Sequence, residues 1–408
     1  MKIQEKLSLP CGTVLPNRIG KSAMSENMAA PLFFPNEKFN KAYKTWIDGG
    51  TGLCITGNVM IDSRYLGEAN NVVIEEGIDN LSELKNWANA SSGSDSHIWV
   101  QLNHPGKQSP KFLTKEPVAP SALALPAPLN NMFNAPRALG EKEIFEIIDR
   151  FGHAAKTVKD CGFDGVQIHG AHGYLVSQFL SSKHNQRSDQ WGGDINGRMK
   201  FVVEVYKKIR ENVGKEFPIG IKINSADFGR GGFSHKEAVE VARKLSELGI
   251  DLIEISGGSY EAPVMTGAKI KGSTQKREAY FLEYAADIKK VISCPLMVTG
   301  GFRTGEFMKE VLSESEQLDV VGLGRALCLN PNFSNEVLAG KKVVSELKRL
   351  TSGSKLIDSI FPLEIIWYTM QIHRMGAGKK PNPRASVYLA IFSSIKEMGL
   401  QSIKRVRS

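Results

Sequence analysis

The chain has 408 residues and a formal net charge of +9, and its 41% hydrophobic and 23% charged side chains are typical of a soluble globular protein. No run of about 18 apolar residues occurs, so a membrane span is not expected. The first residues lack the apolar core of a signal peptide, and the five cysteines are scattered without a Cys-x-x-Cys pair. These features argue against a disulfide framework or an iron–sulfur cluster, and they favour a reducing, cytoplasmic location.

Strand and helix patterns alternate along most of the chain, which predicts a parallel sheet closed as a (β/α)₈ TIM barrel. The expected strands are residues 18–24, 52–56, 97–102, 163–169, 218–224, 251–256, 295–299 and 318–322. Apolar residues recur about every 3.6 positions in the expected helices, which are residues 37–48, 81–90, 141–161, 197–212, 234–248, 277–291 and 304–312. Ser234 and Thr304 are candidate N-caps.

Two segments do not fit the alternation. Residues 104–140 are rich in proline and too long for a simple strand-to-helix turn, so they are expected to cross the barrel mouth as a long loop after the third strand. We assign residues 1–340 to one barrel domain and residues 341–408 to a helical extension with a basic tail. Eight basic side chains and one acid, Glu397, follow Ile372. Such a tail can meet phosphates or acidic membranes, but a solvated helix face is the more common case.

The stretch from Ile168 to Arg198 is the most informative part of the chain. An apolar run suited to a buried strand ends at His169, and His172 and Tyr174 follow within one loop. A single histidine after a strand is usually structural, but two imidazoles and a phenol at one strand end favour a functional pocket. His-x-x-His could supply two metal ligands, yet no third ligand stands at a zinc-site spacing, so no metal is expected.

Glycines follow the last two strands, as Gly300-Gly301 and as Gly324 before Arg325. Backbone N–H groups of glycine turns can approach an anion, and the phosphate sites of TIM barrels commonly use these two loops. A tight structural turn is the alternative. Lys222 lies within a buried strand pattern, where an unpaired charge is costly, and this favours a functional role for it.

The pattern His169-Gly-Ala-His172-Gly-Tyr174, followed by Asn185-x-Arg187-x-Asp189 and later by Asn-x-Arg, resembles the old yellow enzyme family. The resemblance runs from about residue 7 to residue 333 and is weak beyond. It implies a TIM barrel that binds FMN and uses NADPH or NADH as reductant. Larger relatives carry a cysteine-rich iron–sulfur segment after the barrel, which this sequence lacks. The other matched polar residues of the long loop are interpreted as a hydrogen-bonded scaffold.

The resemblance also implies roles for individual residues. Gln101 would pair with the pyrimidine edge of the flavin, and Lys222 would place a cation near N1 and O2, where many relatives have arginine. Ser25 takes the place of a threonine or cysteine that adjusts the flavin potential. The full set expected to bind the cofactor is Ser22, Ala23, Met24, Ser25, Gly57, Gln101, Lys222, Gly300, Gly301, Gly324 and Arg325.

By the same resemblance, His169 and His172 bind a carbonyl or nitro oxygen of a small-molecule substrate, and Tyr174 gives a proton to the α-carbon. Hydride passes from NAD(P)H to FMN and then to the β-carbon, in a ping-pong order typical of an ene-reductase. The alternatives are reduction of a quinone, a nitro compound or oxygen, a flavin-binding protein without turnover, and a tRNA-reducing enzyme. The loops with His169 and Tyr174 contain no cysteine acid, so nucleic acid is not expected. A homo-oligomer is left open.

Overall fold

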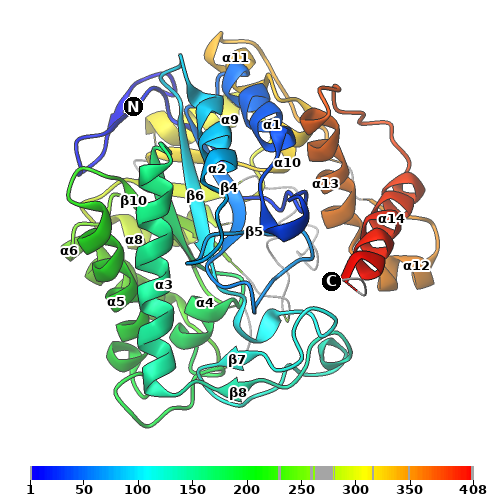
Figure 1. Ribbon diagram of the computed structural model, residues 1–408. Coiled ribbons are helices and arrows are strands. Elements are labelled where there is room, and N and C mark those ends of the chain that lie inside the picture. Colours follow the sequence, from blue (N-terminus) through cyan, green and yellow to red (C-terminus); the bar gives the residue numbers. More distant parts are fainter. Residues whose placement is uncertain are drawn as a thin grey trace.

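The structure, a computed structural model, describes residues 2–227, 231–257, 261, 279, 281–314, 317–347 and 350–405. Eight parallel strands form a closed ring, which confirms the predicted TIM barrel (Figure 1). In ring order they are β3 (Ile19–Lys21), β4 (Leu53–Met60), β6 (His97–Asn103), β9 (Gly165–Gly170), β10 (Ile219–Asn224), β11 (Leu252–Ser256), β12 (Leu296–Thr299) and β13 (Val320–Leu323). The ring closes because β3 pairs with both β13 and β4. A short strand, β5 (Val72–Val73), extends the sheet beside the far end of β4.

Helices surround the ring (Figure 1), and seven of those among the described residues match helices predicted from the sequence periodicity. The helices around the ring are α1 (Glu37–Asp48), α2 (Leu81–Ala88), α3 (Glu141–Asp160), α4 (Leu175–Leu180), α5 (Ile195–Val213), α6 (His235–Glu247), α8 (Leu282–Lys289), α9 (Gly305–Glu314), α10 (Arg325–Leu329) and α11 (Phe333–Leu338). Ser234 caps α6 in a capping box with Glu237, as expected for this residue pair. Of the helix expected at 277–291, residues 277, 278 and 280 lie outside the described residues, and α8 begins at Leu282.

The barrel interior is layered along its axis. Apolar side chains fill the amino end of the ring, where Trp99 of β6, Leu252 of β11 and Met297 of β12 pack with Leu9 and Leu15 of the N-terminal segment. That segment forms a hairpin of β1 (Leu7–Ser8) and β2 (Val14–Leu15). Side chains alternate along a strand, so the next inward residues are Gln101, Glu254 and Thr299. These three residues begin a polar layer, which lies on the carboxyl side of the apolar cluster at the amino end, here called the apolar plug.

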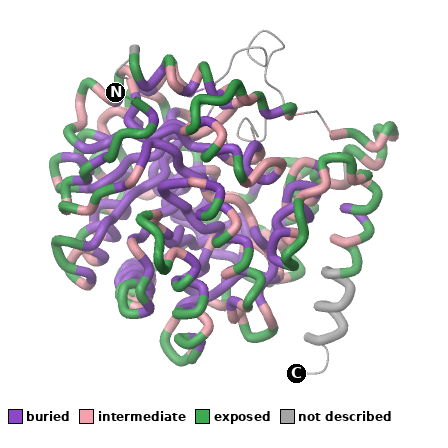
Figure 2. Tube along the Cα trace, turned by 90° about the horizontal axis from the view of Figure 1, so that it is seen from above, coloured by how far each residue is buried: buried purple, intermediate pink, exposed green. Residues whose placement is uncertain are grey.

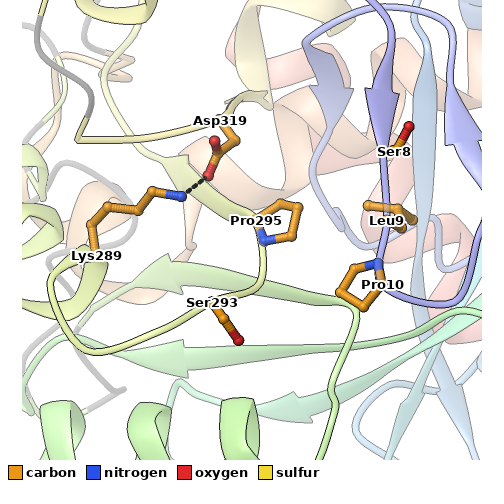
Figure 3. A pocket seen from close by; sticks show the side chains of 7 residues that line it. All are labelled: Ser8, Leu9, Pro10, Lys289, Ser293, Pro295 and Asp319. Carbon is orange, nitrogen blue, oxygen red and sulfur yellow. Dashed lines mark hydrogen bonds and ion pairs between the residues drawn. The ribbon is translucent and has the colours of Figure 1, made fainter.

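An opening of about 300 Å³ lies at the amino end of the barrel (Figure 3). It is lined by Ser8, Leu9, Pro10, Lys289, Ser293, Pro295 and Asp319, and Lys289 pairs with Asp319 at 2.5 Å. Pro295 and Asp319 directly precede β12 and β13. In TIM barrels, residues at this end contribute to stability, whereas catalytic residues lie at the carboxyl ends of the strands.

The excursion after β6 contains the 3₁₀ turns η3 (Gly106–Gln108) and η4 (Leu129–Asn131) and the strand pair β7 (Val118–Ala119) and β8 (Arg137–Ala138). Two further 3₁₀ turns are η1 (Pro31–Phe33) and η2 (Asn89–Ser91). The C-terminal helices are α12 (Lys355–Ile360), α13 (Leu363–Gly376) and α14 (Val387–Arg405). Helix α13 packs on α1 and α10, and α14 packs on α13 at the side of the molecule (Figures 1 and 2). Within the described ranges, no helix is long and apolar enough to cross a membrane.

Candidate active site

The structure brings His169, His172 and Tyr174 together at the carboxyl end of β9. The His169 ring lies 5.1 Å from the His172 ring and 4.9 Å from the Tyr174 ring, measured between centroids. His172 has a φ of 62°, in the left-handed region that non-glycine residues rarely adopt. Asn224 and Ser256 hold it there, because the His172 N–H donates to Asn224 Oδ1 at 3.2 Å and Nε2 lies 2.9 Å from the Ser256 hydroxyl.

Both imidazoles are neutral at pH 7. Burial is the main cause that lowers the pKa of His169 well below its usual range, with smaller effects from His172 and Lys222. Burial, with Lys222 second, lowers the pKa of His172 to about 3. The Nδ1 of His169 accepts the Ala171 N–H at 3.2 Å, so the hydrogen of the neutral ring is on Nε2. His169 is therefore fixed as a neutral Nε2–H donor.

Tyr174 is buried beside Asn58, which directly follows Gly57 on β4. The Asn58 amide donates to the Tyr174 oxygen at 3.5 Å. The Asn58 Oδ1 is buried and has no hydrogen-bond partner among the described residues. A buried amide oxygen without a partner is costly, so this position is suited to a donor from a bound molecule. Asn58 was not predicted from the sequence, because an asparagine near a strand end is also a common loop residue.

A chain of hydrogen bonds crosses the polar layer of the barrel. Gln101 donates to Gln167 at 2.7 Å, and Gln167 donates to Glu254 at 2.7 Å. The other carboxylate oxygen of Glu254 lies 3.0 Å from Lys222 Nζ and accepts the Thr299 hydroxyl at 2.6 Å. The Lys222 and Glu254 side chains are only 3% and 0% exposed. Lys222 thus has a buried partner, which corrects the premise that its charge would be unpaired without a ligand.

The segment after β3 contains four residues expected to contact the cofactor, and contacts with other parts of the chain anchor all four. The Ser25 hydroxyl donates to the Glu68 carboxylate, and the Ser25 carbonyl accepts from Thr369 of α13 at 3.3 Å. Ser22 lies 2.6 Å from Thr299, measured between their hydroxyl oxygens, so this segment is tied to the polar layer. Ala23 is partly buried against the apolar plug, and the Met24 sulfur lies 3.5 Å from that of Cys328.

Gly57 has an evident packing role. Its N–H donates to the Glu26 carboxylate at 2.8 Å, and a Cβ at this position would lie 2.1 Å from Glu26 Oε2 and 2.3 Å from the Met24 carbonyl oxygen. Only glycine allows β4 to approach the segment after β3 this closely.

The two glycine loops lie side by side, because β12 and β13 are paired. Gly300 and Gly301 have φ values of 129° and 86°, a conformation that favours glycine. Gly324 directly precedes α10 and leaves open space where a Cβ would be, apart from the Met24 side chain. Arg325 contacts Glu364 of α13 at 3.3 Å. The sequence did not predict this contact between a candidate phosphate ligand and the C-terminal extension.

The polar residues of the long loop form the predicted scaffold. Asn185 donates to the carbonyls of Phe179 and Trp191, and Arg187 donates to the carbonyls of Pro120 and Leu139. The loop is thereby tied to the excursion after β6. Among the residues that the structure describes, no group of three His, Cys, Asp or Glu side chains is placed to hold a metal ion.

A family model described as the NADH:flavin oxidoreductase / NADH oxidase family matches residues 11–343. The chain belongs to this family. It is 35% identical over 362 residues to the NADH-dependent flavin oxidoreductase iliE of Hypocrea jecorina, covering 83% of this chain and 89% of the relative. It is 34% identical over 302 residues to an NADPH dehydrogenase of Clostridium acetobutylicum, covering 71% and 81%.

Other family members are longer, and the chain spans only 50% or 51% of two curated relatives. Among solved structures, an old yellow enzyme homologue from Zymomonas mobilis superimposes with a TM-score of 0.70 at 21% identity, covering 85% of this chain and 95% of that one. This likeness supports the fold alone. Family membership confirms the predicted class, an oxidoreductase with FMN as cofactor and NADH or NADPH as reductant.

The described residues fit such a cofactor. The unpartnered Asn58 oxygen, the glycine turns after β12 and the buried Lys222 all lie at or near the carboxyl ends of the strands. The individual contacts of the residues predicted to bind FMN stay predictions.

Proposed function

We propose that the protein is an ene-reductase, which reduces an electron-poor C=C bond of a small molecule at the expense of NADH or NADPH. The observation that carries the proposal is the cluster of His169, His172 and Tyr174. In it, the centroids of the His172 imidazole and the Tyr174 phenol lie 5.1 and 4.9 Å from that of the neutral His169 ring. FMN, when bound, supplies the hydride that adds to the β-carbon. The protein has to bind the acceptor, polarise it and deliver a proton.

Polarisation of the acceptor falls to the imidazoles. His169 has a fixed Nε2–H, because Ala171 occupies its Nδ1. A neutral donor stabilises the negative charge that develops on a carbonyl oxygen without losing its own proton. Burial lowers the pKa of both histidines below the usual range of an imidazole, which favours the neutral donor form of each ring near pH 7.

Proton delivery falls to Tyr174. A tyrosine phenol carries an O–H that can be donated to a reacting carbon. The Asn58 amide donates to the phenol oxygen and thereby stabilises the charge that appears when the proton leaves. This pairing supports Tyr174 as the general acid for the α-carbon.

The polar layer and the glycine loops would bind the cofactor. Gln101 and Lys222 are suited to the flavin ring, and Gly300, Gly301, Gly324 and Arg325 are suited to its phosphate. The segment from Ser22 to Ser25, which packs closely against Gly57 of β4, would help to hold the ring.

The test is the visible spectrum of the purified protein under anaerobic conditions. Flavin bands should bleach with NADPH or NADH and return when 2-cyclohexenone is added. Tyr174→Phe should bleach at an unchanged rate, while the return slows by about 10²- to 10⁴-fold, the usual contribution of a general acid. Tyr388→Phe, on the exposed face of α14, is the matched control and should behave as wild type.

Other outcomes would redirect the proposal. If the bands bleach and return only with a quinone, a nitro compound or oxygen, the chain is a flavin reductase with a different acceptor. If Tyr174→Phe returns as fast as the wild type, the proton comes from elsewhere.

A further inference from the structure

The Ser25 hydroxyl is bonded to a carboxylate that the catalytic scheme above does not use. Ser25 follows β3, whereas Glu68 lies in the connection between β4 and β5. The two side chains meet across 43 positions of sequence, with the Ser25 hydroxyl as donor and Glu68 Oε2 as acceptor.

The connection between β4 and β5 is held in place for this contact. The Glu68 N–H donates to Asn71 Oδ1 at 2.7 Å, and the Asn71 amide donates to the Asn58 carbonyl at 3.4 Å. Asn58 also contacts the Tyr174 phenol. Glu68 is thus fixed relative to the candidate active site.

Several titratable and polar groups surround Glu68. Burial raises the pKa of Glu68, and Glu26 raises it further, whereas the Ser25 hydroxyl, His373 and Asn71 lower it. His373 comes from α13 and lies 2.6 Å from the Glu26 carbonyl oxygen through its Nε2. The Ser25 backbone is held from the same helix by Thr369.

The direction of the Ser25 bond matters for a redox cofactor. A hydroxyl has one proton to donate and otherwise offers lone pairs. A hydrogen bond to a carboxylate is roughly twice as strong as one between neutral groups. The Ser25 hydroxyl therefore donates to Glu68 in preference to a neutral flavin atom. Ser25 then presents lone pairs, rather than a proton, to its other neighbours.

We propose that Glu68 is a positioning residue that lowers the reduction potential of the bound flavin by withholding the Ser25 proton from it. The proposal rests on the proposed function, which places Ser25 beside the flavin ring. Reduction adds electron density to the ring, and a donor there stabilises the reduced form. A Ser25 hydroxyl that donates to Glu68 would leave the reduced form of a bound flavin less stable.

The test is the midpoint potential of the FMN-loaded protein, measured at pH 7 against a reference dye. Glu68→Gln keeps the shape but removes the charge, and Glu68→Leu removes the acceptor. At a fixed solution potential, the ratio of reduced to oxidised flavin should rise about tenfold in Glu68→Leu, which is about 30 mV for a two-electron couple. Glu68→Gln should lie between Glu68→Leu and wild type.

A double-mutant cycle with Ser25→Ala separates the action of Glu68 through Ser25 from a direct effect of its charge. The shift caused by Glu68→Gln should largely disappear in the Ser25→Ala protein. Glu76→Gln is the matched control, since its side chain is 87% exposed in the same part of the chain, and its potential should equal that of wild type.

Two results would overturn the proposal. One is an unchanged potential in both Glu68 variants, and the other is an equal shift with and without the Ser25 hydroxyl. If Glu68→Leu does not fold, the Glu68→Gln cycle still decides the question. A wild-type protein that binds no FMN would instead refute the proposed function, so the two failures are distinguishable.

Discussion

Replacing Glu254 by glutamine should destabilise the protein strongly, because three donors converge on its carboxylate. Lys222 lies 3.0 Å from one oxygen, and Thr299 donates to the same oxygen at 2.6 Å. Gln167 donates to the other oxygen at 2.7 Å. A glutamine amide can accept at only one side, so its NH₂ group must face either Gln167 or the pair of Lys222 and Thr299. A flip of Gln167 would not relieve the conflict, since its own oxygen accepts from Gln101.

The size of the effect follows from burial. Both members of the ion pair are at most 3% exposed, and removing one partner of a buried pair costs about 3–5 kcal/mol. The assay is urea denaturation of the FMN-free protein, followed by fluorescence, with Glu254→Gln compared with wild type. The double variant Lys222→Met, Glu254→Leu should recover much of the loss, because no buried charge is left without a partner.

A loss below about 1 kcal/mol in Glu254→Gln would refute this reasoning, as would a double variant that is less stable than the single one. The first result would mean that Lys222 finds another partner or loses its charge at little cost. A surface substitution such as Glu240→Gln on α6 controls for the change in net charge and should stay within about 0.5 kcal/mol of wild type.

Three further predictions follow from local geometry. Acid should destabilise the protein between pH 6.5 and pH 4, because buried imidazoles that stay neutral in the folded state bind protons in the unfolded state. Each such histidine should lower the free energy of unfolding by about 2 kcal/mol at pH 5. Urea denaturation across pH measures this, and a free energy of unfolding that does not change with pH would contradict it. The histidines concerned have a pKa lowered by burial to about 4 or about 3, and are His104, His172 and His184. Gly57→Ala should weaken FMN binding by at least tenfold in a titration of FMN-free protein, because the new Cβ would displace Glu26. The control is Gly77→Ala, which should leave FMN affinity unchanged because no atom lies within 4 Å of the new Cβ. Ser234→Ala should lower the free energy of unfolding by about 1 kcal/mol through the lost helix cap while FMN affinity stays unchanged, and a change in affinity would contradict a purely local role.

The fold was predictable from sequence because each strand is a short apolar run and each helix has a clear apolar face. The residues at the strand ends were also predictable, since parallel strands in a barrel bring their carboxyl ends to one rim. The lengths of the strands were harder to predict from the sequence. The first expected strand, residues 18–24, is only Ile19–Lys21 as β3, because the segment after it leaves the sheet to contact β4 and α13.

The partners of the site residues were not predictable. Gln167 and Glu254 each lie inside an apolar run, and nothing in the sequence tells whether such a residue faces the barrel interior. Glu68 reaches Ser25 from a connection that could take many conformations. The bond between Arg325 and Glu364 depends on how the C-terminal extension docks, and the sequence pattern beyond residue 340 does not specify this.

The contacts of α13 also bear on the order in which the protein can mature. Thr369 and His373 meet the segment after β3 across 344 and 347 positions of sequence. The ring itself closes only when β13 pairs with β3, near opposite ends of the barrel sequence. During synthesis, the segment after β3 therefore reaches its final contacts only after α13 has left the ribosome. A nascent chain that stops before α13 lacks the helix that holds Ser25 and Glu26, so the segment predicted to bind FMN takes its final conformation late in synthesis.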